Sequence, residues 1–128
     1  MMSIFNSLRE NDPTFACSII YTGIKNFDIK IIEKQLEETF RLASKHPKLR
    51  FGFDLVDNED GLKQISDFKK LLISDVKRLK AKYKADVALT LHAGESFKSC
   101  NMNLYDAILM KTQRVGHALA LFKHPRLI

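Results

Sequence analysis

The chain has 128 residues, of which 45% are hydrophobic and 28% charged, a balance typical of a soluble globular protein and not of a disordered tail or a membrane protein. This length predicts a single domain over residues 1–128. Cys17 and Cys100 form neither a CxxC motif nor a disulfide framework. Residues 1–10 show no signal-peptide pattern, and no run approaches the roughly 18 apolar residues of a membrane span.

The formal net charge of +6 comes largely from one basic stretch that is predicted to be helical. This stretch lacks interleaved aromatic residues and any nucleic-acid motif, so a solvated helix face is favoured over a polyanion-binding surface. We therefore expect no nucleic-acid partner and no membrane partner. The basic residues concerned are Lys63, Lys69, Lys70, Lys77, Arg78, Lys80, Lys82 and Lys84.

The first apolar run, residues 15–21, predicts a strand, and the residues after it predict a helix over 29–45. Asp28 is placed to cap the N-terminus of this helix, and Pro47 lies just beyond its end. Strand and helix together form one βα unit. The apolar side chains of the helix recur three or four positions apart, as expected for one buried face: Ile32, Leu36, Phe40 and Ala43.

A second apolar run, residues 49–56, predicts another strand, which leads into the polar loop 57–61. The loop is followed by a second amphipathic helix, so this segment repeats the βα order of the first. The apolar stripe of that helix consists of Phe68, Leu71, Leu72, Val76 and Leu79.

Two further units follow. Residues 86–91 predict a third strand, which is succeeded by a loop over 96–103 and a short helix over 104–111. Residues 113–116 predict a brief fourth strand that ends on His117. The sequence thus predicts an α/β fold with about four βα units.

Four such units fit either an open doubly wound sheet or half of a (β/α)8 barrel, and periodicity does not separate the two. In a barrel, reactive residues gather at the C-terminal ends of the strands, where the loops converge around one opening. Polar residues occupy these positions repeatedly, namely Asp57 and Glu59 after the second strand, His92 and Glu95 after the third, and His117 after the fourth.

His92 and Glu95 lie three positions apart, directly after the third predicted strand. An imidazole can bind a metal ion, and a nearby carboxyl group can exchange a proton with a substrate or with water. Taken alone, one histidine beside one glutamate is more simply interpreted as a hydrogen-bonded loop pair.

His117 ends the next predicted strand, and neighbouring parallel strands lie about 5 Å apart. The imidazoles of His92 and His117 are therefore expected at one rim of the sheet. Position alone favours the simpler interpretation, in which His117 is a partly buried strand-end residue bonded to the backbone.

The remaining histidines, His46 and His124, each precede a proline. They are interpreted as surface residues that complement helix C-termini, and no function is assigned to them. Asp54 and Asp60 are interpreted as a strand-end acid and a turn acid.

Three segments together are more specific. They are Gly-Phe-Asp-Leu-Val over 52–56 with Glu59 and Asp60, His-Ala-Gly-Glu over 92–95, and residues 103–125, which include Arg-Val-Gly-His over 114–117. In order, spacing and strand position they resemble the adenosine deaminase family, in particular its secreted branch, the adenosine deaminase-related growth factors. The resemblance extends over nearly the whole chain.

The resemblance implies a partial (β/α)8 TIM barrel to which residues 1–128 contribute the third to sixth strands. It implies a hydrolase that converts adenosine and water to inosine and ammonia with one zinc ion. His92 corresponds to a zinc ligand, Glu95 to the residue that protonates the purine ring, and His117 to the residue that assists the attacking water. Substrate-binding residues are not assigned. The resemblance also implies an extracellular enzyme.

Two matched positions depart from the family pattern. The family glycine that follows Gly-Phe-Asp-Leu-Val, whose backbone meets the purine, is Asp57 here, and the glycine after Arg-Val-Gly-His is Ala118. Because glycine often marks a close approach of backbone to ligand, an aspartate side chain is expected to obstruct the pocket or to change its substrate. Asp57 is not assigned as a binding residue.

The family's paired H-x-H of the first strand and its paired aspartates of the last strand have no counterpart in these residues. Catalytic zinc takes about three protein ligands, and only His92 is a convincing one here. We expect the chain alone to bind zinc poorly and to be inactive. The alternative hypothesis is an inactive half-barrel that acts by binding, or as a homodimer joined through its open strand edges.

Overall fold

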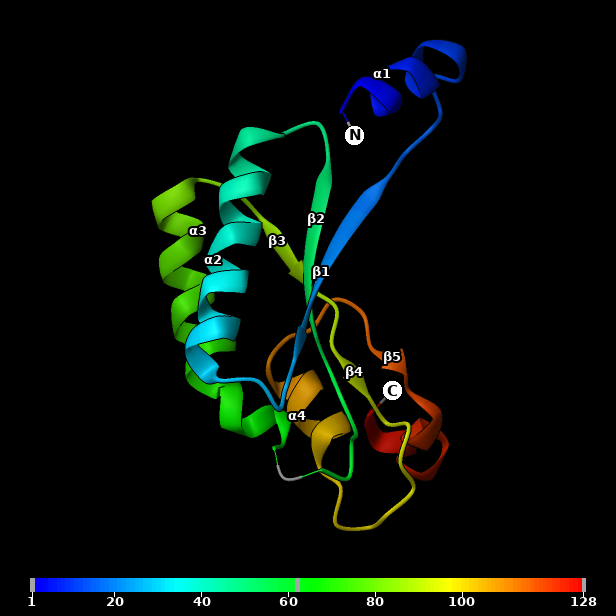
Figure 1. The fold of residues 1–128 in the computed structure, drawn as a ribbon. Coiled ribbons are helices and arrows are strands. Elements are labelled where there is room, and N and C mark those ends of the chain that lie inside the picture. Colours follow the sequence, from blue (N-terminus) through cyan, green and yellow to red (C-terminus); the bar gives the residue numbers. More distant parts are fainter. Residues whose placement is uncertain (1, 62, 128) are drawn as a thin grey trace.

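The computed structural model describes residues 2–61 and 63–127. It is an α/β fold in which parallel strands alternate with helices (Figure 1). In chain order, the helices and strands are α1 (Met2–Asn11), β1 (Ser18–Ile24), α2 (Ile29–Lys45), β2 (Arg50–Val56), η1 (Ile65–Phe68), η2 (Lys70–Asp75), α3 (Val76–Tyr83), β3 (Val87–Leu89), β4 (His92–Ala93), α4 (Asn103–Leu109), β5 (Gly116–His117), η3 (Leu119–Lys123) and η4 (Pro125–Leu127).

The parallel strands lie side by side in chain order. β1, β2 and β3 form one sheet in that order, and β4 pairs with β5 in a second. Only Thr90 and Leu91 separate β3 from β4, and the hydrogen-bond partner changes there. Thr90 N donates to Phe53 O of β2 at 3.0 Å, whereas Gly116 N of β5 donates to Leu91 O at 2.9 Å. Among the strands of the described residues, the order shows no reversal of the kind that defines a doubly wound sheet.

Helices α2 and α3 lie next to each other on one side of the β1–β3 sheet (Figure 1). Alternate residues of β2 point into this layer, because successive side chains of a strand face opposite ways. Phe53 and Leu55 have no exposed surface. Full burial of such side chains contributes about 1.5–3 kcal/mol each. The α2 residues of this core include those predicted from helical periodicity: Ile32, Leu36, Phe40 and Ala43.

The opposite face of the sheet carries small and polar side chains of β2 and of the segment after β3, together with isoleucines of β1. A Cβ atom built on Gly52 would meet the side chains of Ile20 at 3.3 Å and Thr90 at 3.6 Å, which places these residues on one face. Asp54 follows on the same side, two positions after Gly52. Within the described residues, β1 pairs only with β2, and Ile20 and Ile24 are each 38% exposed.

Strand limits differ from the sequence-based expectations. The first strand runs over Ser18–Ile24 instead of 15–21, because its whole length is aligned with β2, from Ser18 opposite Arg50 to Ile24 opposite Val56. The third breaks after Leu89, and its continuation β4 contains His92. The fourth is confined to Gly116–His117. Pairing partners, and not local hydropathy, set these limits.

The helices also differ in detail. α2 has the predicted span, and its cap is confirmed, since the Asp28 carboxylate accepts a hydrogen bond from Lys30 N at 2.7 Å. The second predicted helix is a succession of a 3₁₀ turn, a π-helical segment and α3. α1 was not predicted. It lies at the end of the strands opposite to β4 and β5 (Figure 1), and its Phe5 is buried against Phe15.

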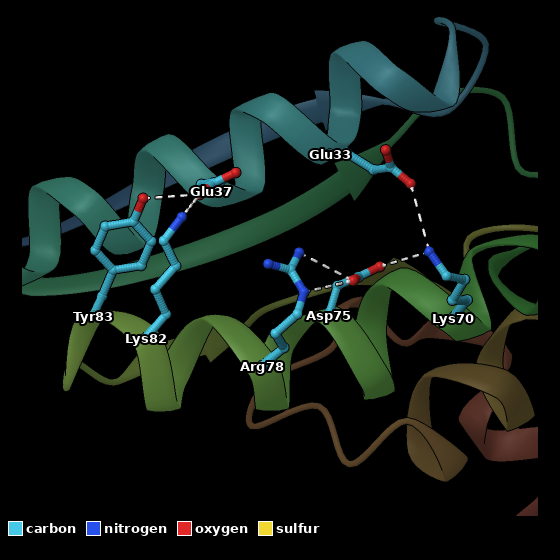
Figure 2. Close-up of polar contacts among 7 residues, drawn as sticks. All are labelled: Glu33, Glu37, Lys70, Asp75, Arg78, Lys82 and Tyr83. Carbon is cyan, nitrogen blue, oxygen red and sulfur yellow. Dashed lines mark hydrogen bonds and ion pairs between the residues drawn. The ribbon is translucent and has the colours of Figure 1, made fainter.

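Ion pairs join the basic stretch to α2 (Figure 2). Glu37 accepts hydrogen bonds from Lys82 at 2.6 Å and from Tyr83 at 2.9 Å, and these bonds lower the pKa of Glu37. On the π-helical segment, Asp75 accepts two hydrogen bonds from Arg78, at 3.1 and 3.2 Å. Lys70 lies 3.4 Å from Asp75 and 4.0 Å from Glu33. These contacts give several of the basic residues a structural role between helices.

No helix within residues 2–61 and 63–127 combines the length and the apolar character needed to cross a membrane.

The turn after β5 has a left-handed backbone. His117 and Ala118 have φ angles of +63° and +53°, and Gly94 beside them has a φ of +78°. Ala118 N donates to Ala93 O at 3.0 Å, and Ala120 N donates to Gly94 O at 2.7 Å. This backbone conformation costs a residue with a Cβ atom about 1–2 kcal/mol. Hydrogen bonds to the β4 segment hold the turn in place.

Replacing Ala118 by glycine should therefore raise the free energy of unfolding by about 1 kcal/mol, measured by urea denaturation. Ala93→Gly is the matched control, since Ala93 lies in regular strand β4 and glycine there should lower stability by about 0.5–1 kcal/mol. Equal losses in both variants would contradict the left-handed conformation of Ala118.

Asp75→Asn should lower the free energy of unfolding by about 1–2 kcal/mol, because the Asp75 side chain is only 12% exposed and accepts hydrogen bonds from charged groups. Glu33→Gln should change it by less than about 0.5 kcal/mol, since that side chain is 42% exposed and its ion pair is long. Urea denaturation of both variants measures the difference. A loss in Glu33→Gln as large as that in Asp75→Asn would count against this interpretation of the network.

Candidate functional site

Three of the polar residues predicted at the strand ends, His92, Glu95 and His117, come together at the C-terminal end of β4 and β5. The rings of His92 and His117 lie edge to face, with centroids 5.1 Å apart. His117 Nε2 is 3.7 Å from Glu95 Oε2. The Glu95 side chain is 61% exposed and that of His117 is 40% exposed, so both are open to solvent. The structure therefore groups all three predicted site residues.

Asp54 of β2 holds His92. Its carboxylate accepts hydrogen bonds from His92 N at 3.0 Å and contacts His92 Nδ1 at 2.5 Å. The Asp54 side chain is 3% exposed. Because Nδ1 is bonded to Asp54, Nε2 is the ring nitrogen of His92 that can bind a metal ion. A carboxylate that accepts a hydrogen bond from the other ring nitrogen of a metal-binding histidine is the usual arrangement at metal sites.

Two simpler interpretations of these histidines were wrong. His92 pairs with Asp54 and not with Glu95. Side chains alternate between the two faces of a sheet, and His92 and Asp54 lie on the same face of neighbouring strands. His117 is directed toward Glu95 and His92. The role of Asp54 was missed by sequence reasoning. Its signal was the only polar residue within the run 51–56 of β2, on the face that Phe53 and Leu55 do not occupy.

Gly116 allows the His92 ring to lie directly against β5. A Cβ atom at this position would come within 2.7 Å of His92 Cδ2 and 3.0 Å of Nε2. Real Cβ contacts are not this short, so any side chain at Gly116 would displace the imidazole. Position 116 therefore requires glycine, because its backbone lies so close to the His92 ring.

The loop after β2 clamps the segment that carries Glu95. Glu59 is 6% exposed, and its carboxylate accepts hydrogen bonds from Gly94 N and, at 2.6 Å, from Ser96 N. These two amides lie on either side of Glu95. Asp60 accepts a hydrogen bond from Ser96 Oγ at 2.6 Å. This bond is the largest of the effects that lower the pKa of Asp60. Asp60, interpreted from sequence as a turn acid, thus ties two loops together.

Asp57 has a φ of +147°, a backbone conformation in which glycine is the ordinary residue. The position at which the family resemblance led us to expect glycine thus has a glycine-like backbone in this chain. The Asp57 carboxylate accepts hydrogen bonds from Asn58 N at 2.7 Å and from Asn26 N at 3.3 Å. These bonds turn it toward the loop after β1 and offset part of the conformational cost.

The two histidines to which no function was assigned lie at helix ends. His46 follows α2, and its N–H donates to Leu42 O. His124 follows η3 and is half-buried, with Nδ1 2.7 Å from the Tyr105 hydroxyl. The Tyr105 contact was not foreseen.

A complete metal site is not formed by these residues. Among the described ranges, no group of three His, Cys, Asp or Glu side chains is placed to hold a metal ion. His92 alone fits the chemistry of one zinc ligand, because Nδ1 is bonded to Asp54 and Nε2 can bind the ion.

No protein-family model matches the chain. The sequence is similar to adenosine deaminase 2 from Homo sapiens, with 33% identity over 120 residues, which cover 91% of this chain and 22% of that protein. It is 33% identical over 120 residues to adenosine deaminase 2 from Dictyostelium discoideum, and the match covers 94% of this chain and 22% of that protein. It is 31% identical over 123 residues to adenosine deaminase from Lutzomyia longipalpis, and the match covers 94% of this chain and 23% of that protein.

The chain therefore spans less than a quarter of the length of each of these relatives. The similarity extends over at least nine tenths of the chain and includes the strands that carry Asp54, His92 and His117. Over the segment that it shares with these proteins, the chain is homologous to the adenosine deaminases.

Proposed function

We propose that this chain is the part of a zinc-dependent adenosine deaminase that holds one zinc ligand, His92, and two catalytic residues, Glu95 and His117. The observation that supports this most is the convergence of the three side chains at the ends of β4 and β5, with Asp54 buried behind His92. Relatives named adenosine deaminase are similar to this chain over 91% and 94% of its length.

The reaction adds water to a purine ring carbon and releases ammonia, which converts adenosine to inosine. Zinc, when bound, supplies a water that loses a proton near neutral pH. Glu95 is the proton donor to the adjacent ring nitrogen, which prepares the carbon for attack. His117 lies 3.7 Å from Glu95 and assists the attacking water. Asp54 keeps the His92 ring in the orientation that leaves Nε2 for the ion.

We further propose that the strands are the third to sixth of a (β/α)8 barrel. Their chain order, their parallel pairing and the α2–α3 layer on one face support this arrangement. The small and polar face that contains Gly52, Asp54 and Thr90 would then line the barrel interior. An extracellular location is proposed from the same family resemblance.

A second candidate function is an inactive binding or dimerising module. The unpaired edge of β1 within the described residues and the partly exposed Ile20 and Ile24 favour it, since open strand edges promote association. A soluble, cooperatively folded oligomer of the isolated chain would support this function, whereas an insoluble or molten product would count against it. Size-exclusion chromatography and urea denaturation separate these outcomes.

Glu95→Gln tests the catalytic proposal in a longer protein that contains this segment, with ammonia release from adenosine as the assay. The variant should lose essentially all ammonia release while keeping its zinc, because the amide cannot donate the proton but Glu95 is not a ligand. Ammonia release and metal content are measured together. Full activity in Glu95→Gln would overturn the mechanism, and absence of ammonia release by the parent protein would favour the module.

Gly116→Ala tests the assignment of His92 as a ligand. The added methyl group would displace the imidazole, so the longer protein should lose at least about tenfold in zinc affinity, a typical effect of disturbing a ligand's support. Zinc titration against a competing chelator measures this. Gly23→Ala is the control, since a Cβ atom there would meet the Leu55 and Phe53 side chains at 3.2 and 3.3 Å and no atom of His92. Unchanged zinc affinity in Gly116→Ala would contradict the assignment.

A further inference from the structure

One side chain holds the backbone on both sides of Glu95. Glu59, in the loop after β2, is 6% exposed, and its two carboxylate oxygens accept hydrogen bonds from Gly94 N and, at 2.6 Å, from Ser96 N. Hydrogen bonds to an ionised acceptor are roughly twice as strong as neutral ones. Because these two residues are the immediate neighbours of Glu95, the Glu59 carboxylate fixes the backbone from which the Glu95 side chain extends.

The same residue also holds the far end of this loop. The backbone carbonyl of Glu59 accepts hydrogen bonds from Asn101 Nδ2 at 2.9 Å and from Asn103 Nδ2 at 3.0 Å. Asn103 has no exposed surface, and its Oδ1 accepts a hydrogen bond from Ile65 N at 2.7 Å. The loops after β2 and β4 lie next to each other (Figure 1). Both ends of the segment 94–103 are thus attached to one residue of the adjacent loop.

The Glu95 side chain takes little support from packing. It is 61% exposed, and its carboxylate lies 3.7 Å from His117 Nε2, which is too far for a hydrogen bond. The middle of the loop is also open to solvent, since Phe97 is 51% and Met102 is 49% exposed. The position of the Glu95 carboxyl group therefore depends on the backbone that carries it.

We propose that Glu59 is a positioning residue for Glu95 that acts through the two amides beside it. His92 is held separately, by Asp54. Glu59 should therefore govern the position of the proton donor and not that of the metal ligand. The catalytic part of this inference rests on the proposed function, whereas the hydrogen bonds from the two amides to Glu59 concern this chain by itself.

Amide hydrogen exchange, followed by NMR on the 128-residue chain, tests these hydrogen bonds. Glu59→Gln keeps the size of the side chain, but its amide group offers one acceptor oxygen in place of two. At least one of the two backbone amides, Gly94 or Ser96, then faces a donor and should exchange on the order of tenfold faster. Unchanged exchange at both amides would overturn the proposal.

Two controls separate this local effect from general destabilisation. The amide of Thr90, which donates to Phe53 O at 3.0 Å inside the sheet, should exchange at an unchanged rate in Glu59→Gln. Asp60→Asn makes the same chemical change at the next residue, whose carboxylate accepts from the Ser96 hydroxyl, and should leave the exchange of Gly94 unchanged. Equal acceleration at Thr90 in Glu59→Gln, or tenfold acceleration at Gly94 in Asp60→Asn, would contradict the specific role of Glu59.

A measurement on the unaltered chain serves if Glu59→Gln does not fold. Scalar couplings pass across hydrogen bonds, so NMR should detect couplings from the amide nitrogens of Gly94 and Ser96 to Cδ of Glu59. The coupling from Thr90 N to the carbonyl carbon of Phe53 is the positive control, because that hydrogen bond lies inside the sheet. Detection of the control coupling without either Glu59 coupling would refute the proposal.

In the longer protein, Glu59→Gln should lower kcat by at least about tenfold with little change in KM, because a misplacement of about 1 Å can cost on the order of 100-fold in rate. Its zinc affinity should stay unchanged, since Asp54 and not Glu59 holds His92. Glu33→Gln makes the same chemical change on α2 and should leave kcat unchanged. A loss of zinc affinity in parallel with kcat would indicate a general structural role and would overturn the positioning role.

The two kinds of experiment separate this inference from the proposed function. If the exchange results hold but the longer protein releases no ammonia, the proposed function fails while the hold of Glu59 on the two amides stands. If the longer protein is active and Glu59→Gln keeps the full kcat, the positioning role fails while the proposed function stands.

Discussion

The site depends on one buried contact between neighbouring strands, the pair of hydrogen bonds from His92 to the Asp54 carboxylate. It forms because β2 and the β3–β4 segment run parallel, so that both side chains face the same side of the sheet. A slip of one residue would turn Asp54 into the helix layer and leave a buried charge unpaired. The position of His117 follows from this contact, since Gly116 packs directly against the fixed His92 ring.

Around this contact, acidic side chains hold the loops by hydrogen bonds, and several residues have a strained backbone. Of the acids after β2, Glu59 accepts hydrogen bonds from the amides on either side of Glu95, and Asp57 accepts one from the loop after β1. Asp57, His117 and Ala118 all have positive φ angles although none is glycine. Such conformations persist where surrounding hydrogen bonds determine them, and they gather at functional sites. The helix layer of α2 and α3 carries its own apolar core and its own ion pairs, so it provides a rigid base for these loops.

Much of this could be predicted from the residues alone. The periodicity of Ile32, Leu36, Phe40 and Ala43 and the cap at Asp28 specify α2, because helix spacing and capping act within a few positions of the chain. The grouping of His92, Glu95 and His117 was predicted from strand ends and from family resemblance, and the structure places them together. These are local patterns and short motifs, which a sequence displays directly.

The tertiary structure decided the strand limits and the side-chain contacts that depend on residues distant in sequence. The span of β1 was set by its alignment with β2, and the burial of Asp54 and Glu59 by contacts 35 or more positions away along the chain. The choice of Asp54, and not Glu95, as the partner of His92 needed the relative position of two strands. Local sequence determines which segments become strands and helices. Register and close packing determine which side chains meet, because both depend on the energy of the assembled sheet and not on any single segment.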